Sequence, residues 1–349
     1  MFSTYKESDV TLLLKDITNL VVPLPTEERE KRIQQGVHYS EMLPIEYVPS
    51  QDYLKLFFDG LDRYAGITAR AVASAAMKIR EKKNGRPVLV SLARAGTPVG
   101  ILIKRYLDAR FDTDVPHYSI SVIRGKGIDK NAMRTILSRY EPERLQFVDG
   151  WTGKGAIQNE VNAAMKDYPG VDPGLAVLSD PAAIAGIAGT YDDFFIANSC
   201  LNSTVSGLLS RTFCDRVIIG ENDYHGAAFY SELAQSDLTY RFIDRIVSEF
   251  TFTETVLREN KPKTSGLDEV TGICSAFGVN DVNKVKPGIG EATRVLLRRV
   301  PWKILVRSLD DEAHLGHIYQ LAKEKGVTVE DYPLQNYRAC GIIKTMADT

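Results

Sequence analysis

Short apolar runs alternate with amphipathic stretches along the first two thirds of the chain. Residues 52–83 have apolar side chains at helical spacing and end at Gly85 after a basic run, which predicts one long helix. Short apolar runs predict buried strands at residues 87–93, 117–123, 145–149, 175–179, 194–198 and 216–220. Helical stretches lie between the earlier runs, at residues 99–110, 130–139 and 156–166. This alternation predicts an α/β fold with a mainly parallel sheet and helices on both faces.

A polar stretch at residues 257–269 interrupts this pattern and contains Pro262 and Gly266. We therefore predict two domains, residues 1–256 and 267–349, joined by a linker at 257–266. The second domain contains strand-like runs at 303–309 and 327–333 and a helical stretch at 312–325. It is expected to be a small α/β domain.

The composition limits the partners, cellular location and metal sites expected for the protein. The 349 residues are 44% hydrophobic and 25% charged, with a net charge of -2, so no overall attraction to nucleic acid or membranes is expected. The first residues lack the apolar run of a signal peptide or membrane span, which predicts a cytoplasmic protein without a membrane partner. The four cysteines are widely separated, so free thiols are expected. His314 and His317 lack a third ligand at suitable spacing and are interpreted as surface residues rather than a metal site.

Three loops that follow predicted strands combine glycine with a cation: residues 94–98 (RAGTP), 124–131 (RGKGIDKN) and 150–155 (GWTGKG). Ligands of open α/β sheets bind at the carboxyl ends of the strands, and glycines and cations in such loops favour phosphate. The spacing excludes a Walker A motif, because Val148 and Gly155 stand where glycine and Ser or Thr are required. The loops predict a polyphosphorylated ligand.

These three loops resemble those of type I phosphoribosyltransferases, which bind 5-phosphoribosyl 1-pyrophosphate (PRPP) with Mg²⁺. More narrowly, the chain resembles the phosphoribosyltransferase-like proteins of tellurite-resistance and stress gene clusters, which join a StiP-type domain to a C-terminal Pelota RNA-binding domain. The resemblance implies phosphoribosyl transfer, or its reverse on a nucleotide-like substrate, in a pathway that makes a nucleoside-like metabolite.

The same resemblance implies site residues. Asp149 would hold the ribose hydroxyls or their Mg²⁺, although Gly150 stands where the family has a second acid. The other catalytic residues implied are Arg94, Arg124 and Lys126. The PRPP-binding residues implied are Ala93, Ala95, Gly96, Thr152, Gly153, Lys154 and Gly155.

Two other functions remain open. The StiP-type family is also labelled a cysteine protease, and Cys200 with His225 would supply a nucleophile and base, oriented by Asp223 or Asn222. A buried structural thiol is the simpler interpretation of Cys200. The third function is a non-catalytic regulator that binds PRPP or a nucleotide. We expect the transferase, with the cysteine peptidase as the alternative.

The second domain resembles Pelota and kink-turn-binding proteins, which implies structured RNA as a partner. The RNA-binding residues implied are Lys286, Gly288, Gly290, Glu291, Arg294 and Arg298, with the loop at 337–342 beside them. Residues 267–349 contain eleven Lys or Arg and eleven Asp or Glu, so the overall charge does not favour RNA. Only a local patch does, and a solvated helix face is the alternative; the patch consists of Lys284, Lys286, Arg294, Arg298 and Arg299. The sequence also allows a homo-oligomer.

Overall fold

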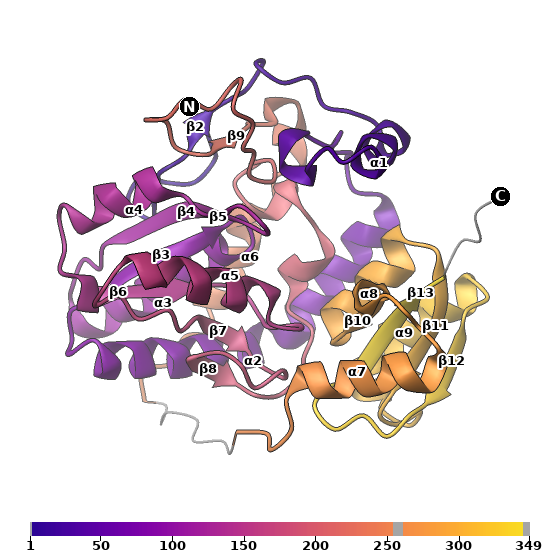
Figure 1. Cartoon of the computed structure of the whole chain (residues 1–349). Helices are drawn as coiled ribbons and strands as arrows, with labels where there is room; N and C mark the ends of the chain where they lie inside the picture. The colour runs from indigo at the N-terminus through magenta and orange to yellow at the C-terminus, as the bar shows by residue number, and fades with distance from the viewer. Residues whose placement is uncertain (1, 254–260, 345–349) are drawn as a thin grey trace.

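A computed structural model describes residues 2–253 and 261–344 (Figure 1). Part of the predicted linker and the last five residues of the predicted second domain lie outside these ranges. The main sheet has seven strands in the order β1-β4-β3-β6-β7-β8, with β5 paired to β4. All of its pairings are parallel except β4 with β5, so the predicted α/β fold with a mainly parallel sheet is confirmed. The finer type I phosphoribosyltransferase arrangement stays a prediction.

The sheet strands are β1 (Thr11–Leu12), β3 (Val88–Ala93), β4 (His117–Ile123), β5 (Gly127–Ile128), β6 (Leu145–Val148), β7 (Ala176–Ser179) and β8 (Ile187–Thr190). The helices beside them are α2 (Gln51–Lys82), α3 (Gly96–Phe111), α4 (Lys130–Leu137), α5 (Ala156–Ala164) and α6 (Thr239–Val247). Each predicted helix up to residue 166 is present, although α3 starts three residues earlier than expected.

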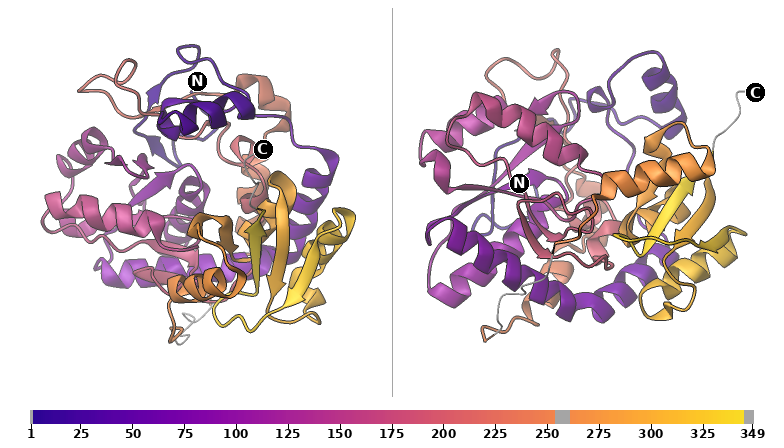
Figure 2. Two further views of the ribbon diagram at one scale, coloured as in Figure 1. Left: turned by 45° about the vertical axis from the view of Figure 1, so that its right-hand side comes forward. Right: turned by 60° about the horizontal axis from the view of Figure 1, so that its bottom comes forward.

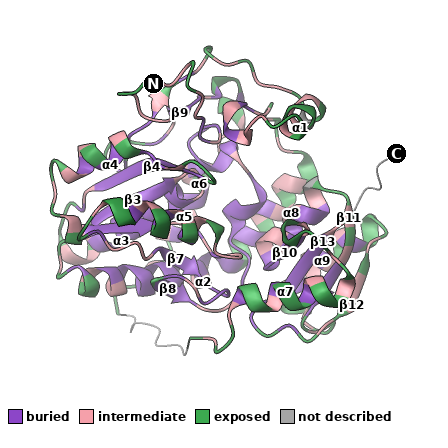
Figure 3. Cartoon of the chain, in the orientation of Figure 1, coloured by how far each residue is buried: buried purple, intermediate pink, exposed green. Residues whose placement is uncertain are grey.

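Helices cover both faces of the sheet because its strands are apolar on both sides. Leu89 of β3 packs into the cluster formed with α2 and α3. Its neighbours Val88 and Val90 pack into a second cluster, with α4 and α5. Figure 3 shows the sheet and the inner side of α2 as buried. This continuous burial explains why the strands appear in the sequence as unbroken apolar runs.

Two of the predicted strands are wrong. Residues 194–198 lead into the short helix η4 (Ala197–Cys200), which packs against helices rather than against a strand. Residues 216–219 form a turn in which the N–H of Ile219 donates to the carbonyl of Asp215 and Val217 is 93% exposed. The sheet instead includes β8, whose small residues Ala188 and Gly189 did not predict a strand. The carbon that a side chain would add at Gly189 lies 2.5 Å from the carbonyl oxygen of Ala71, so close packing of α2 requires glycine there.

The second domain has a four-stranded sheet in the order β10-β13-β11-β12. Its strands are β10 (Val285–Pro287), β11 (Pro301–Val306), β12 (Thr328–Asp331) and β13 (Ala339–Ile343). The helices α8 (Ile289–Arg298) and α9 (Glu312–Glu324) pack together on the side of the first domain, and α7 (Gly266–Phe277) packs on the other side. The predicted small α/β domain is present.

The two domains share an apolar core. The helix α2 has 32 residues, or about 48 Å, and its first half contacts the second domain while its second half packs on the main sheet (Figure 2). The hydroxyl of Tyr53 donates to the carbonyl of Leu297, and that of Tyr64 donates to the carbonyl of Ala313. A single cluster includes Phe57 from α2 and Ile289 from α8. The domains are therefore packed together rather than only linked in sequence.

Several of the remaining elements lie beyond the carboxyl ends of the main-sheet strands (Figure 1). They include β2 (Lys15–Asp16), β9 (Gly226–Ala227), α1 (Thr26–Gln34) and the short helix η1 (Tyr39–Glu41). Further short helices are η2 (Pro142–Arg144), η3 (Met165–Asp167), η5 (Ser203–Val205), η6 (Ser231–Ser236) and η7 (Val282–Lys284). Among the helices that the structure describes, none is long and apolar enough to cross a membrane. All four cysteines lie in the described part of the chain, and none of them forms a disulfide bond.

Candidate functional site

The cations expected to bind PRPP do follow the strands β3, β4 and β6, but the protein itself already engages three of them. Arg94 Nη1 donates to Glu46 Oε1 at 2.9 Å, and Lys126 Nζ donates to Glu41 Oε1 at 2.6 Å. Lys154 Nζ donates to two carbonyl oxygens of the second domain, those of Val282 and Val285. Arg124 is exposed, and its side chain has no hydrogen bond to another described residue.

The loop at residues 149–155 forms part of the domain interface. The Thr152 hydroxyl donates to Asp180 Oδ1, and the carbonyl of Gly153 accepts a hydrogen bond from Tyr337 of the second domain at 2.6 Å. Gly155 has a φ of +88° where α5 begins, which explains the glycine at this turn without a bound phosphate. The loop is therefore built to receive the second domain.

Asp149, expected to hold ribose or Mg²⁺, lies directly after β6 and is partly buried. Its Oδ1 accepts a hydrogen bond from the backbone N–H of Gly150 at 2.8 Å, and burial raises the pKa of its carboxyl group to about 6. The two small residues expected to grip pyrophosphate lie in the tightly packed β3–α3 turn, where Ala93 ends the strand and Ala95 caps the helix. The carbon that a side chain would add at Gly96 lies 2.5 Å from the carbonyl oxygen of Val148. Glycine there allows the helix to approach the neighbouring strand.

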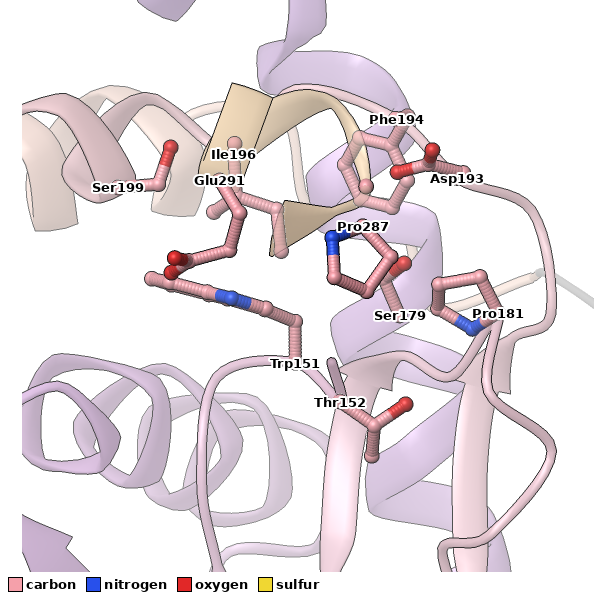
Figure 4. Close-up of a pocket in the computed structure, with 12 residues that line it drawn as sticks. Trp151, Thr152, Ser179, Pro181, Asp193, Phe194, Ile196, Ser199, Pro287 and Glu291 are labelled. Carbon is pink, nitrogen blue, oxygen red and sulfur yellow. The ribbon is translucent and has the colours of Figure 1, made fainter. Parts of the chain in front are cut away.

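A pocket lies between the two domains beside this loop (Figure 4). Trp151, Ser179 and Asp193 line it from the first domain, and Pro287 and Glu291 from the second. Its volume is about 10 Å³, which is the room that about one water molecule needs. It is far too small for PRPP.

The predicted pair of Cys200 and His225 is not brought together. Cys200 ends η4, is completely buried in the core between α2 and α8, and its thiol lies 3.1 Å from the carbonyl oxygen of Ala197. His225 instead precedes β9, beside β2 at the edge of the molecule shown at the top of Figure 1. Cys200 is thus a core residue, as its apolar surroundings require.

A different cysteine lies opposite His225. Phe213 and Gly226 form an antiparallel pair in which each N–H donates to the other's carbonyl at 2.8 Å. Continued by one residue on each segment, this register pairs Cys214 with His225. In regular antiparallel geometry such a non-hydrogen-bonded pair has both side chains on the same face, with Cβ atoms about 4.5–5.5 Å apart.

The backbone hydrogen bonds that Cys214 and His225 form with other segments agree with this register. The N–H of Cys214 donates to the carbonyl of Ser40 at 2.8 Å, and the carbonyl of His225 accepts from the N–H of Lys15 at 2.9 Å. Both groups point away from the shared pair, as the backbone groups of a non-hydrogen-bonded pair must. Cys214 and His225 therefore face each other across two short extended segments.

His225 is held by two polar groups, one at its ring and one at its backbone. Its Nδ1 lies 2.9 Å from Ser121 Oγ, and its backbone N–H donates to Asp129 Oδ2 at 2.5 Å. Burial lowers the pKa of His225, while the carboxylate of Asp129, itself buried, acts in the opposite direction. When Nδ1 donates to Ser121, the other ring nitrogen is the free acceptor.

The thiol of Cys214 is partly exposed and lies near charges of both signs. Burial raises its pKa, the ammonium of Lys126 opposes this, and the carboxylates of Asp129 and Glu41 add to it. Lys126 Nζ also donates to the carbonyl of Cys214 at 2.7 Å. The resting pair is thus a neutral thiol beside a neutral imidazole, the starting state for proton transfer from sulfur to nitrogen.

The groups expected to orient His225 have other roles. Asp223 Oδ2 accepts a hydrogen bond from Lys15 Nζ at 2.6 Å, and Asn222 is exposed. The carboxylate beside His225 is instead that of Asp129, which also caps α4. The sequence signal for Cys214 was weak, because it depends on the alignment of two short segments eleven residues apart rather than on a recognisable motif.

The expected RNA face is partly covered by the first domain. The N–H of Ile289, the first residue of α8, donates to both carboxylate oxygens of Asp193, and the carbon added by a side chain at Gly290 would lie 3.0 Å from Ser199 Oγ. Gly288, at the same helix end, has a φ of +93°. The position expected for an RNA phosphate is therefore occupied by Asp193.

Among the described side chains, the cations expected to bind RNA are less buried than Ile289 at the start of α8. Arg294 pairs with Glu291 at 3.0 Å. Burial lowers the pKa of Lys286, and the charges of Arg299, Arg294 and Arg124 lower it further, so these cations lie near one another. The side chain of Arg298 lies outside the described part of the structure.

The two histidines of α9 have separate partners. His314 Nδ1 lies 2.6 Å from Asp311 Oδ1, and His317 Nε2 lies 3.0 Å from Thr293 Oγ1. Within residues 2–253 and 261–344, no group of three His, Cys, Asp or Glu side chains is placed to hold a metal ion.

Two family models match this chain. The model described as tellurite-like stress resistance cysteine protease StiP matches residues 3–247, and the model described as PELOTA RNA binding domain matches residues 264–345. The protein named cysteine protease StiP from Acinetobacter baylyi is 34% identical over 366 residues, which cover 98% of this chain and 94% of that protein. These names match the peptidase alternative, so the prediction of PRPP-dependent transfer is wrong. The Mg²⁺ expected with PRPP loses its basis as well.

Proposed function

The chain belongs to the StiP family, and on this premise we propose that it is a cysteine peptidase in which Cys214 is the nucleophile and His225 the general base. The observation that carries the proposal is the antiparallel pairing of Phe213 with Gly226, because its register sets Cys214 opposite His225. Cys200 does not fit this role, since its thiol is buried in the shared core.

Peptide hydrolysis would proceed in two halves. In the first, the free ring nitrogen of His225 accepts the thiol proton as the sulfur of Cys214 attacks the peptide carbonyl carbon. The imidazolium then gives this proton to the departing amine, which leaves an acyl group on the sulfur as a thioester. In the second half, His225 takes a proton from water, whose oxygen attacks the thioester and releases the acid and the thiol.

Two neighbouring charges would support these steps. The buried carboxylate of Asp129 stabilises the imidazolium that forms during attack. The ammonium of Lys126, which lies at the backbone carbonyl of Cys214, stabilises negative charge that develops on the sulfur. Ser121 holds the ring through Nδ1 and so fixes which nitrogen faces the thiol.

Covalent labelling tests the assignment directly. A peptidyl chloromethyl ketone should alkylate Cys214, as read by mass spectrometry of the digested protein, and His225→Ala should slow this labelling at least about tenfold, because the thiol then lacks its base. Labelling of another cysteine, or labelling of Cys214 at an unchanged rate in His225→Ala, would contradict the proposed pair.

RNA binding by the second domain is a further candidate function, favoured by the match of residues 264–345 to the Pelota RNA-binding family. We propose that RNA contacts the cations Lys286, Arg294 and Arg299 rather than the N-terminus of α8, which Asp193 occupies. Clustered cations bind the phosphate backbone without reading its sequence. The test is the salt dependence of RNA binding by the Lys286→Ala and Arg294→Ala variants.

A further inference from the structure

Three arginine side chains gather beside η1 with one carboxylate among them. Arg29 lies in α1, Arg94 follows β3, and Arg211 lies in the segment that leads to Cys214. Arg94 pairs with Glu46 at 2.9 Å, and that carboxylate is only 7% exposed. Arg94 Nη1 also donates to the carbonyl of Leu209, two residues before Arg211, at 3.0 Å. Burial lowers the pKa of Arg211 to about 10, and the charges of Arg29 and Arg94 lower it further while Tyr39 and Glu46 oppose this, so both arginines lie within electrostatic range of Arg211. We call Arg29, Arg94 and Arg211 the arginine cluster.

Among the residues that the structure describes, neither Arg29 nor Arg211 forms a salt bridge with a carboxylate. The Nε atom of Arg29 is buried and has no hydrogen-bond partner. The guanidinium carbon of Arg211 lies 4.8 Å from the ring centroid of Tyr39, and no carboxylate of the described residues forms a salt bridge with it. A buried cation is unfavourable unless it is paired, so the cluster is short of negative charge.

The arginine cluster lies close to the proposed nucleophile. Arg211 precedes Cys214 by three residues, a span of about 10 Å when extended. The ring of Tyr39 contacts the guanidinium group of Arg211. The next residue, Ser40, accepts the N–H of Cys214 on its carbonyl at 2.8 Å. A peptide bound at the thiol can therefore reach the cluster with a side chain, or with its chain end, within a few residues of the cleaved bond.

We infer that the arginine cluster binds a carboxylate of the peptide substrate and so favours cleavage of peptides that place a carboxylate within its reach. The inference rests on the proposed peptidase function. A carboxylate is the matching group because the planar fork of a guanidinium donates two parallel hydrogen bonds to it. The carboxylate is either an acidic side chain or the C-terminal carboxylate of the peptide, since the cluster offers the same chemistry to both.

The test measures binding separately from cleavage. Full-length Cys214→Ala protein is titrated calorimetrically with three peptides of equal length. One contains glutamates and an amidated C-terminus, the second has neutral side chains and a free C-terminus, and the third is neutral and amidated. The carboxylate source is the peptide that binds more tightly than the third. Adding Arg211→Gln or Arg29→Gln should weaken that peptide's binding about tenfold or more, because a charge-assisted contact is lost. The exposed Arg216→Gln is the matched control and should leave binding unchanged.

Equal binding of the three peptides, or binding that neither Arg211→Gln nor Arg29→Gln weakens, overturns the inference. The two arginine variants lie on different segments, so a folding defect in one leaves the other as a test. Cleavage of the same peptides by the wild-type protein is measured in parallel. Arginine-dependent binding without any cleavage supports the carboxylate site while contradicting the peptidase function, and cleavage without carboxylate preference does the reverse.

Discussion

The carboxylate of Asp193, in the first domain, accepts the backbone N–H of Ile289, the first residue of α8, at 3.0 and 3.2 Å. It also accepts the N–H of Arg338 at 2.9 Å, so one side chain ties the first domain to two segments of the second. A helix N-terminus attracts negative charge, and here the chain supplies that charge itself. The contact explains how α8 is held against the first domain.

Replacing this carboxylate should loosen the contact between the domains. We expect Asp193→Ala to lower the free energy of unfolding by about 2–3 kcal/mol, because it leaves two buried backbone N–H groups without their acceptor. Thermal unfolding followed by circular dichroism measures the effect. Asp310→Ala, which removes an exposed carboxylate, is the control, and equal melting temperatures for the two variants would show that Asp193 does not hold the domains.

Asp149 predicts a pH-dependent stability. Its folded-state pKa of about 6 lies above its ordinary value of 3.8, so the folded protein binds its proton more tightly than the unfolded chain does. Stability is therefore lost as pH rises through about 4–6. Asp149→Asn should raise the free energy of unfolding at pH 7 by about 1–3 kcal/mol, since the amide keeps an acceptor for the Gly150 N–H and carries no charge. A variant that is less stable than the wild type at pH 7 would contradict this view of Asp149.

His225 predicts the acid limb of the activity profile. Burial lowers its pKa below 6.5, so kcat/KM should rise with pH through a midpoint below that value as the imidazole loses its proton. The negative charge of Asp129 opposes this lowering, so Asp129→Asn should move the midpoint to still lower pH. The pH dependence of peptide hydrolysis measures both. A midpoint that does not move in Asp129→Asn would show that Asp129 does not act on the base.

RNA binding should depend on the cations beside α8. Lys286→Ala and Arg294→Ala should each weaken binding of a structured RNA and reduce its salt dependence by about one unit of log K against log salt, because each contact releases counterions. Fluorescence anisotropy over a salt series measures the slope. The control is Lys325→Ala, which removes an exposed cation at the far end of α9. If Lys286→Ala and Arg294→Ala keep the wild-type slope, as the control Lys325→Ala should, this face does not bind the RNA.

The sequence predicted most of the fold because helices and buried strands leave periodic apolar patterns. The run 117–123 became β4 with the same bounds, and the helix predicted at 52–83 became α2. The strand prediction for residues 194–198 was wrong because an apolar segment buried between helices has the same sequence pattern as a buried strand.

The site was harder to predict because it depends on contacts between distant residues. Lys154 was predicted to bind phosphate, yet its ammonium donates hydrogen bonds to carbonyls about 130 residues away. No local sequence pattern predicts partners at that separation. His225 was identified as the base, but Cys214 emerges only from the register with Gly226. Cys200 is completely buried, so its simpler interpretation as a structural thiol is confirmed.

The most direct test of the central claim compares two cysteine variants in one assay. Hydrolysis of an unfolded protein substrate such as casein is measured for the wild type, Cys214→Ala and Cys200→Ala, after each is shown to be folded by circular dichroism. We expect Cys214→Ala to reduce kcat at least about a thousandfold, because the nucleophile is lost, and Cys200→Ala to keep most of the activity. Undiminished hydrolysis by Cys214→Ala would contradict the account, whatever the activity of Cys200→Ala.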